Sequence, residues 1–326
     1  MTAFHGVGAR GRETPNWRLE ARQSAESHRE GIDLLGDTLE FAVERLEAVY
    51  GEGRAGGGGR SLLPILAARA IGTVDAIHAL LTVGRVEQAD MLVRTLVDLQ
   101  ADAHLLVGTE DAASYYVDWA KVEQARAALQ MRPEEMVRPG RDLAARREEL
   151  ANELISRLGD YEPESARRLK GRPLDEVLES FCKIRYRSRS PISWKQGYMR
   201  GVGLTAAAVR ERIVVTAAEA AQLEGLPNHM REFFQQTFAR ELELLFGYLS
   251  AEIHNSPLAI NRLIDPSTKA IRIYGDTAGL PRPLMGAFQH LLRIMLLLET
   301  EWTDHPANAE WSSRALAMSE SVGDLP

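Results

Sequence analysis

The sequence predicts an all-α protein, a multi-helix bundle with one small β-hairpin near its C-terminal end. Two observations support this prediction. Apolar residues recur at three- and four-residue spacing through most of the chain, which is the period of an amphipathic helix. The alternation of strands and helices that is typical of Rossmann-type and other α/β folds is not found. Aromatic residues make up only 6% of the chain, so we expect a core of Leu, Ala, Val and Ile.

The segment 228–257 is the expected centre of the bundle. Its apolar stripe runs along one helical face through Phe234, Phe238, Leu242, Leu245, Leu249 and Ile253. Asn228 is a suitable N-cap, and Pro257 ends the helix because proline cannot continue it. A second line carries Glu243, Gly247, Ser250 and His254, and its small residues would let another helix approach closely. We therefore expect contacts on two sides of this helix.

Residues 61–304 are expected to form the bundle itself. The predicted helices cover residues 61–83, 85–107, 111–130, 141–158, 173–181, 206–224, 228–257 and 283–302. The helix 85–107 is apolar on most sides, so we expect it to be buried, whereas 141–158 has a narrow stripe and is expected at the periphery. Residues 260–264 and 270–274 flank the sequence DPSTK and predict the hairpin.

Four further segments complete the predicted organisation. Residues 1–15 are rich in Gly and Arg without periodicity and predict a disordered tail. Residues 16–50 predict an N-terminal helix, and 51–60 a glycine-rich linker. This linker would leave the helix as an appendage or let it dock flexibly, on its own chain or on a neighbouring subunit. Residues 305–326 predict a polar, frayed C-terminal tail.

Composition limits the classes of function. The net charge of -7 and the pI near 5.7 argue against a protein held on nucleic acid by its overall charge, although a local basic patch is compatible with them. Cys182 is the single cysteine, which excludes a disulfide framework and favours a cytoplasmic location. The N-terminus lacks the apolar core of a signal peptide, and the apolar run 291–298 is too short to span a bilayer. We expect no membrane association.

The segment 183–201 is the strongest local change in composition. It holds six basic residues and no acidic one, with aromatic residues between them. Arginine and lysine neutralise phosphates while aromatic rings stack on bases, so the segment is a candidate RNA-binding site. The candidate nucleic-acid-binding residues are Arg185, Arg187, Arg189, Trp194 and Lys195. The alternative is a solvated loop that balances the acidic bundle, with Trp194 anchoring it to the core.

No metal or other cofactor is expected. Asp75 and His78 form an i,i+3 pair on one predicted helix, and such pairs can bind metals in bundles. The remaining candidate ligands are Asp102, His104, Glu252 and His254, but the complete Glu-x-x-His pattern is missing. We favour scattered polar residues at helix ends. The glycines at 51–59 lack the Lys-Ser/Thr of a phosphate-binding loop.

Three pieces of the sequence carry a resemblance to a known family. They are the buried-helix segment 94–99 (RTLVDL), Trp194, and the segment 248–254 (YLSAEIH), followed by the hairpin-like segment and a last helix. In this order they resemble the uncharacterised bacterial helical family of domain-of-unknown-function number five-six-seven-seven, over residues 61–302. The resemblance implies a helical fold and, as signature positions, Arg94, Ser250 and His254.

A catalytic hypothesis uses the same positions. HEPN (higher eukaryotes and prokaryotes nucleotide-binding) helical bundles include metal-independent RNases in which a histidine acts as acid/base and an arginine binds the phosphate. In this chain His254 and Arg94 would take those roles, with Ser250 beside them. The supporting residues would be Asp98, Tyr248 and Glu252. The chain departs from that pattern, because no arginine lies four to six residues before His254.

The alternative for these residues is structural. Arg94 and Asp98 would form a buried ion pair that locks two helices together. His254 would be a histidine in a last helical turn, favoured there by the helix dipole. The sequence therefore predicts an interaction or regulatory module with a protein or RNA partner and a capacity for homo-oligomerisation. The likeness to helical bundles of bacterial defence and stress systems suggests that setting. The RNase is the alternative function.

Overall fold

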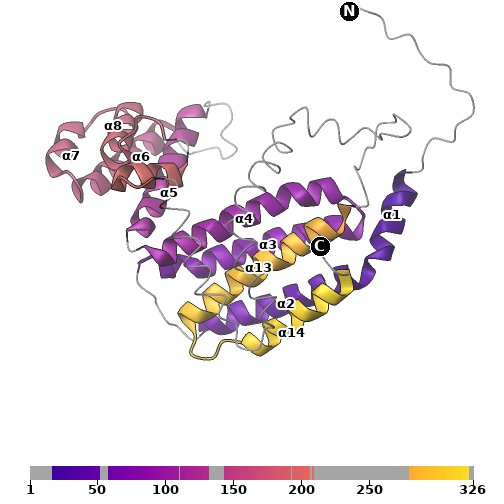
Figure 1. Cartoon of the computed structure of the whole chain (residues 1–326). Coiled ribbons are helices and arrows are strands. Elements are labelled where there is room, and N and C mark those ends of the chain that lie inside the picture. The colour runs from indigo at the N-terminus through magenta and orange to yellow at the C-terminus, as the bar shows by residue number, and fades with distance from the viewer. Residues whose placement is uncertain are drawn as a thin grey trace, which may run out of the picture. The chain divides into compact units, whose positions relative to one another are not determined.

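The described part of the chain is entirely helical. The structure, a computed structural model, describes residues 17–51, 58–109, 111–131, 143–191, 193–205, 208 and 279–322 (Figure 1). These ranges hold eleven α-helices and one 3-10 helix, and they contain no strand. The prediction of an all-α protein is confirmed. The expected hairpin at 260–274 and the expected central helix at 228–257 both lie outside the described residues.

The helices divide between two compact units. Unit 1 comprises residues 1–53, 65–100 and 221–326, and unit 2 comprises 54–64 and 101–220. Unit 1 contains α1 (Trp17–Ser27), α2 (Arg29–Gly51), α3 (Leu63–Thr82), the first part of α4 (Val86–Gly108), α13 (Pro281–Trp302) and α14 (Asn308–Val322). Unit 2 contains η1 (Gly58–Leu62), the end of α4, α5 (Ala112–Gln130), α6 (Leu143–Gly159), α7 (Pro163–Leu169), α8 (Leu174–Tyr186) and α9 (Trp194–Val202). One predicted bundle therefore corresponds to parts of two units.

The N-terminal segment is part of unit 1. It forms two helices, α1 and α2, and α2 packs against both α13 and α14 (Figure 1). Its apolar stripe explains this contact, because Ile32, Leu35 and Leu39 are buried at helical spacing. Helix α13 is buried on nearly all its sides, including the polar residues Gln289 and Arg293. The N-terminal helix thus docks in cis.

The expected C-terminal tail at 305–326 is wrong for most of its length. Residues Asn308–Val322 form α14, which packs on α2 and α13. Trp311 is fully buried, and its ring meets Phe41 of α2 edge to face at 4.7 Å between ring centroids. Polar composition concealed a narrow apolar stripe, on which Ala315 and Met318 are also buried.

Glu299 joins three helices of unit 1. Its carboxylate is fully buried and accepts two hydrogen bonds from Arg45 of α2, each 3.0 Å long. It also accepts from the backbone N–H of Ala307 at 2.6 Å and from Nε1 of Trp311 at 2.8 Å. Both oxygens therefore have two donors. The Arg45 side chain also donates to the carbonyl of His305 at 3.1 Å.

A buried histidine lies on α13. His290 is 1% exposed, and its Nδ1 lies 2.6 Å from Oε1 of Gln100 on α4. Burial, together with the nearby charge of Arg293, lowers the pKa of His290 to about 3. The imidazole is therefore neutral at physiological pH and serves as a hydrogen-bonding core residue.

Helix α6 is the centre of unit 2, not a peripheral element as its narrow stripe suggests. It packs against α5, α7 and α8 (Figure 1). Leu150, Leu154 and Leu158 are at most 1% exposed. The expectation failed because α6 receives its polar contacts on flanking positions. There Arg147 donates to the carbonyls of Ala128, Leu129 and Met131 at the end of α5.

Candidate functional site

The basic segment forms the end of α8, a short connection and α9. Ser193 caps α9, because its hydroxyl accepts from the N–H of Gln196 at 3.2 Å. Gly203 ends α9 in the left-handed conformation, with φ of 75°. The segment is therefore a defined helical corner of unit 2 and not an extended loop.

The aromatic rings of this corner point inward. Tyr186, Trp194 and Tyr198 are at most 5% exposed. Nε1 of Trp194 donates to Oδ1 of Asp102 at 3.1 Å, and Nζ of Lys195 lies 2.5 Å from the same oxygen. Trp194 thus anchors the segment to α4. Base stacking on these rings would require them to leave the core.

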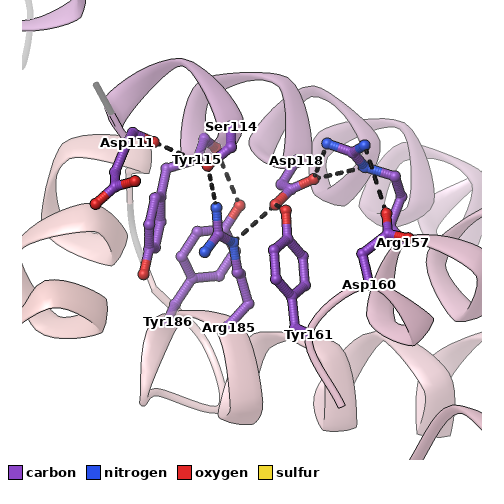
Figure 2. A network of polar contacts seen from close by, with 9 residues as sticks. All are labelled: Asp111, Ser114, Tyr115, Asp118, Arg157, Asp160, Tyr161, Arg185 and Tyr186. Atoms are coloured by element: carbon purple, nitrogen blue, oxygen red, sulfur yellow. Dashed lines mark hydrogen bonds and ion pairs between the residues drawn. The ribbon is translucent and has the colours of Figure 1, made fainter. Parts of the chain in front are cut away.

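Asp118 of α5 lies at the centre of the polar network of this unit (Figure 2). It is fully buried, and its carboxylate accepts hydrogen bonds from three other positions in the chain. Nε of Arg157 lies 2.9 Å from Oδ1, and the Tyr161 hydroxyl lies 2.8 Å from Oδ2. Nε of Arg185 donates to Oδ2 at 2.7 Å. One carboxylate therefore ties α5 to α6, α8 and the turn after α6.

Arg185 is held on every side. Its Nη2 donates to the Ser114 hydroxyl at 2.5 Å (Figure 2). Its guanidinium lies 3.4 Å from the ring centroid of Tyr115 and 4.2 Å from that of Tyr161. Cations are attracted to aromatic faces at such distances. The side chain is only 9% exposed, so a predicted RNA-binding residue takes part in the internal network.

The network holds its protons in place near neutral pH. Burial and the hydrogen bond to Asp118 raise the pKa of Tyr161 to about 12. Burial also raises the pKa of Tyr115 and of Tyr186 above the ordinary value. Burial lowers and Asp118 raises the pKa of Arg157, with a net rise. These groups are therefore hydrogen-bond donors with structural roles, and we assign them no acid/base chemistry.

Four cations of the segment point outward. Lys183, Arg187, Arg189 and Arg200 are all exposed. Arg189 pairs with Glu179 across 3.3 Å, with side chains 75% and 54% exposed, and such exposed pairs are weak. Arg200 donates to the hydroxyl of Ser188 at 2.9 Å. Because these contacts join the end of α8 to α9, the cations belong to one surface, which we call the basic corner.

Arg187 has an unusual backbone. It follows α8 in the left-handed conformation, with φ of 48°, and its N–H bonds back to the carbonyl of Cys182. Within the described residues it is the single non-glycine residue with positive φ, while Gly58, Gly84, Gly171 and Gly203 adopt that conformation elsewhere. An L-residue there is strained by about 1–2 kcal/mol. A strained residue that exposes a charge is a candidate functional residue.

The predicted catalytic residues are only partly described. Arg94 and Asp98 lie one turn apart on α4, with Nε to Oδ2 at 3.4 Å and side chains 20% and 38% exposed. The expected pair therefore lies within one helix and is half-buried, so by itself it does not lock two helices. Tyr248, Ser250, Glu252 and His254 lie outside the described residues. The predicted catalytic group stays a prediction.

The candidate metal ligands are dispersed. Among the described residues, no group of three His, Cys, Asp or Glu side chains could hold a metal ion. Asp102 is engaged by Trp194 and Lys195, and His104 is 1% exposed. Cys182 is buried, and burial raises its pKa to about 11, so its thiol is unreactive near neutral pH.

A cavity of about 560 Å³ also lies in unit 2. It is lined by residues of α6 and of the turn before α8, with Leu129 at the end of α5. Its two arginines have other contacts. Arg147 donates to carbonyls at the end of α5, and Arg172 lies 3.8 Å from Glu176. The basic corner is therefore the better candidate for contact with an anionic partner.

Sequence reasoning missed Asp118, Arg157 and Tyr161. One signal for Asp118 was present in the helix predicted at 111–130. Asp118 lies three residues after Tyr115 and four before Val122, and both neighbours are on the buried face. An acid within a buried stripe requires a cationic or hydrogen-bonding partner. The identity of its partners had no local signal, because they lie 39, 43 and 67 residues away.

Fold and site together define a class. The protein is an all-α protein whose second unit is held by a buried carboxylate network and carries a basic corner. The sequence profile of one family, a family of unknown function (DUF5677), matches residues 61–271, which is more than half of the chain. The chain belongs to this family. No curated protein matches the chain, and no solved structure matches it.

Proposed function

We propose that this protein is an interaction module whose unit 2 binds RNA through phosphate contacts at the basic corner. The observation that carries the proposal is Arg187, a strained, exposed arginine at a position where glycine would be relaxed. Three further exposed cations surround it. Because the aromatic rings are buried, the contact would be electrostatic and independent of base sequence.

The charge distribution supports this proposal. Residues 101–220 hold 20 basic and 19 acidic residues, so the overall charge of -7 is carried elsewhere in the chain. A near-neutral unit with a basic corner does not repel a polyanion as the whole-chain charge suggests. An alternative explanation for Lys183 and Arg185 is the negative end of the α8 dipole, which favours cations in the last turn. That explanation does not extend to Arg189 or Arg200.

Cleavage is not part of the proposal. The RNase hypothesis depends on Ser250 and His254, and the described residues add no support to it. The rigid network around Asp118 supports a binding role instead, because it fixes α8 and so fixes the direction of the cations that follow it. A preorganised surface loses less conformational entropy on binding.

We expect charge reversal at the basic corner to weaken RNA binding. The test variant is Arg187→Glu/Arg189→Glu, and fluorescence anisotropy with a labelled single-stranded RNA measures its dissociation constant across a salt series. We expect affinity to fall at least about tenfold, and the slope of log K against log salt to fall by about two, one for each lost phosphate contact.

The matched control is Arg167→Glu/Arg168→Glu. These two arginines lie on α7 in the same unit, are exposed, and give the same change in net charge. We expect this control to bind within about twofold of the wild type once salt is fixed. Equal weakening in both variants would show that only net charge matters. Absence of RNA binding by the wild type would direct the search to a protein partner, and intact RNA on a gel would separate binding from cleavage.

The strain at Arg187 predicts a trade-off between stability and binding. Arg187→Gly should raise the stability of unit 2 by about 1 kcal/mol, because glycine adopts the left-handed conformation without strain. The same variant should bind RNA more weakly. Thermal unfolding and anisotropy on one preparation measure the two effects.

The converse variant, Gly203→Ala, is the control for the backbone argument. Gly203 occupies the equivalent position after α9 with φ of 75°, and a Cβ there would meet no atom within 4 Å. We expect a loss of about 1 kcal/mol from backbone strain alone. If Arg187→Gly lowers stability instead, the arginine is retained for a structural reason and the argument for its function fails.

A further inference from the structure

Helix α3 has an exposed face of unusual composition. The face consists of Ile65, Ala68, Arg69, Gly72, Asp75, Ala76, Ala79 and Val83, which recur at three- and four-residue spacing and are all exposed. Ile65 is 65% exposed and Val83 is 53% exposed. A Cβ on Gly72 would meet no atom within 4 Å. The opposite face, with Leu66, Ile77 and other apolar residues, is buried.

This composition differs from that of an ordinary solvated face. The exposed line of α2 in the same unit carries Glu40, Glu44 and Glu47. On α3 the exposed face is instead apolar or small apart from two charged side chains. By length and composition alone, the stretch Gly58–Thr82 would qualify to cross a membrane, a test that core helices of soluble proteins also pass. An exposed apolar face of this extent indicates an interaction surface.

The two charges on this face are arranged symmetrically. Arg69 lies three residues before Gly72, and Asp75 lies three residues after it. Neither side chain forms an ion pair with any part of the chain that the structure describes. In an antiparallel helix pair centred on Gly72, Arg69 of one copy comes to the level of Asp75 of the other. The two-fold symmetry generates this match twice.

The small residues fit the same arrangement. With the crossing point at Gly72, Ala68 lies at the level of Ala76 in the second copy, and Ile65 at the level of Ala79. Small side chains at a crossing point let two helices approach closely, as in right-handed crossings of the glycine type. The larger apolar residues then lie at the ends of the contact, where the helices diverge and leave more space.

We propose that this α3 face binds a second copy of the chain, forming an antiparallel two-fold dimer centred on Gly72. The surface is self-complementary in charge and in shape, as an isologous interface requires. A single helix pair buries an area at or below the lower end of stable interfaces, about 1,200 Å² in total. We therefore expect association in the micromolar range.

A charge-swap series on the full chain tests the proposal. Sedimentation velocity over a concentration series measures the dimer dissociation constant. Arg69→Glu and Asp75→Arg each place two like-charge pairs across the contact, so we expect dimerisation to weaken about tenfold in each. The double variant Arg69→Glu/Asp75→Arg restores opposite charges, and we expect it to return to within about threefold of the wild type.

A steric variant provides the second arm. Gly72→Leu places a large side chain at the crossing point and should weaken dimerisation about a hundredfold. Since a Cβ at Gly72 meets nothing within the subunit, and leucine favours helix more than glycine, thermal stability should not fall. A wild-type chain that remains monomeric at about 100 μM, well above that range, a dimer that tolerates Gly72→Leu, or flotation of the wild type with phospholipid vesicles would overturn the proposal.

Discussion

Replacing Asp118 with alanine is expected to destabilise unit 2 by about 3–5 kcal/mol, because it leaves buried cations without their counter-ion. Arg185, which is 9% exposed, would lose the acceptor of its Nε. The hydroxyl of Tyr161 and the guanidinium of Arg157 would also lose their acceptor. The two units need not unfold together, so urea unfolding should be followed by hydrogen exchange in α5, α6 and α8.

Asp160 provides the matched control for Asp118. Its carboxylate lies 3.9 Å from the same Arg157 but is 65% exposed. We expect Asp160→Ala to change stability by no more than about 0.5 kcal/mol. Asp118→Asn, which keeps the shape but removes the charge, should resemble Asp118→Ala more than Asp160→Ala. Equal, small effects of Asp118→Ala and Asp160→Ala would contradict the central role of Asp118.

The consequence of this prediction extends to binding. Asp118 fixes Arg185 in the last turn of α8, and Arg187 follows two residues later. Loss of the network would loosen the end of α8 and let the basic corner take many conformations. The lower affinity of an Asp118 variant for RNA would then come with normal charge, unlike that of the charge-reversed variant. Salt dependence separates the two, because Asp118→Ala leaves the number of cations unchanged.

The helical class could be predicted from periodicity because each helix repeats its own apolar stripe. The segment at 111–130 shows how far this goes, since Tyr115 and Trp119 are buried as their spacing indicates. Periodicity assigns a face to a residue without naming what covers that face. Helix α6 has a narrow stripe and yet contacts three helices of its unit, which its own sequence could not reveal.

The candidate site was predicted in composition and only partly in geometry. The basic segment 183–201 was located correctly as a distinct element, and its bland alternative was right for Trp194, which anchors it through Asp102. The direction of each cation was not predictable, because Arg185 and Arg187 are two residues apart and have opposite environments. One position turned inward by a remote carboxylate changes the meaning of the motif.

Glu299→Gln should destabilise unit 1 by about 3–5 kcal/mol, since a buried charged group loses its match with a buried arginine. Each carboxylate oxygen accepts from two donors, which are Arg45 and Trp311 on Oε1, and Arg45 and Ala307 on Oε2. A glutamine amide supplies one oxygen and one NH₂ group. The NH₂ group would face two donors in either orientation, so the isosteric side chain cannot restore the network.

Glu310→Gln is the control for Glu299→Gln. Glu310 is 49% exposed on α14 and pairs with Arg314 one turn away at 3.0 Å. Removing this charge should change stability by no more than about 0.5 kcal/mol. The fluorescence of Trp311 and hydrogen exchange in α14 measure local opening, because Trp311 donates directly to Glu299. We expect α14 to exchange faster in Glu299→Gln and at the wild-type rate in Glu310→Gln. Protection of α14 that survives in Glu299→Gln would show that the apolar contacts of Trp311 hold this helix without the carboxylate.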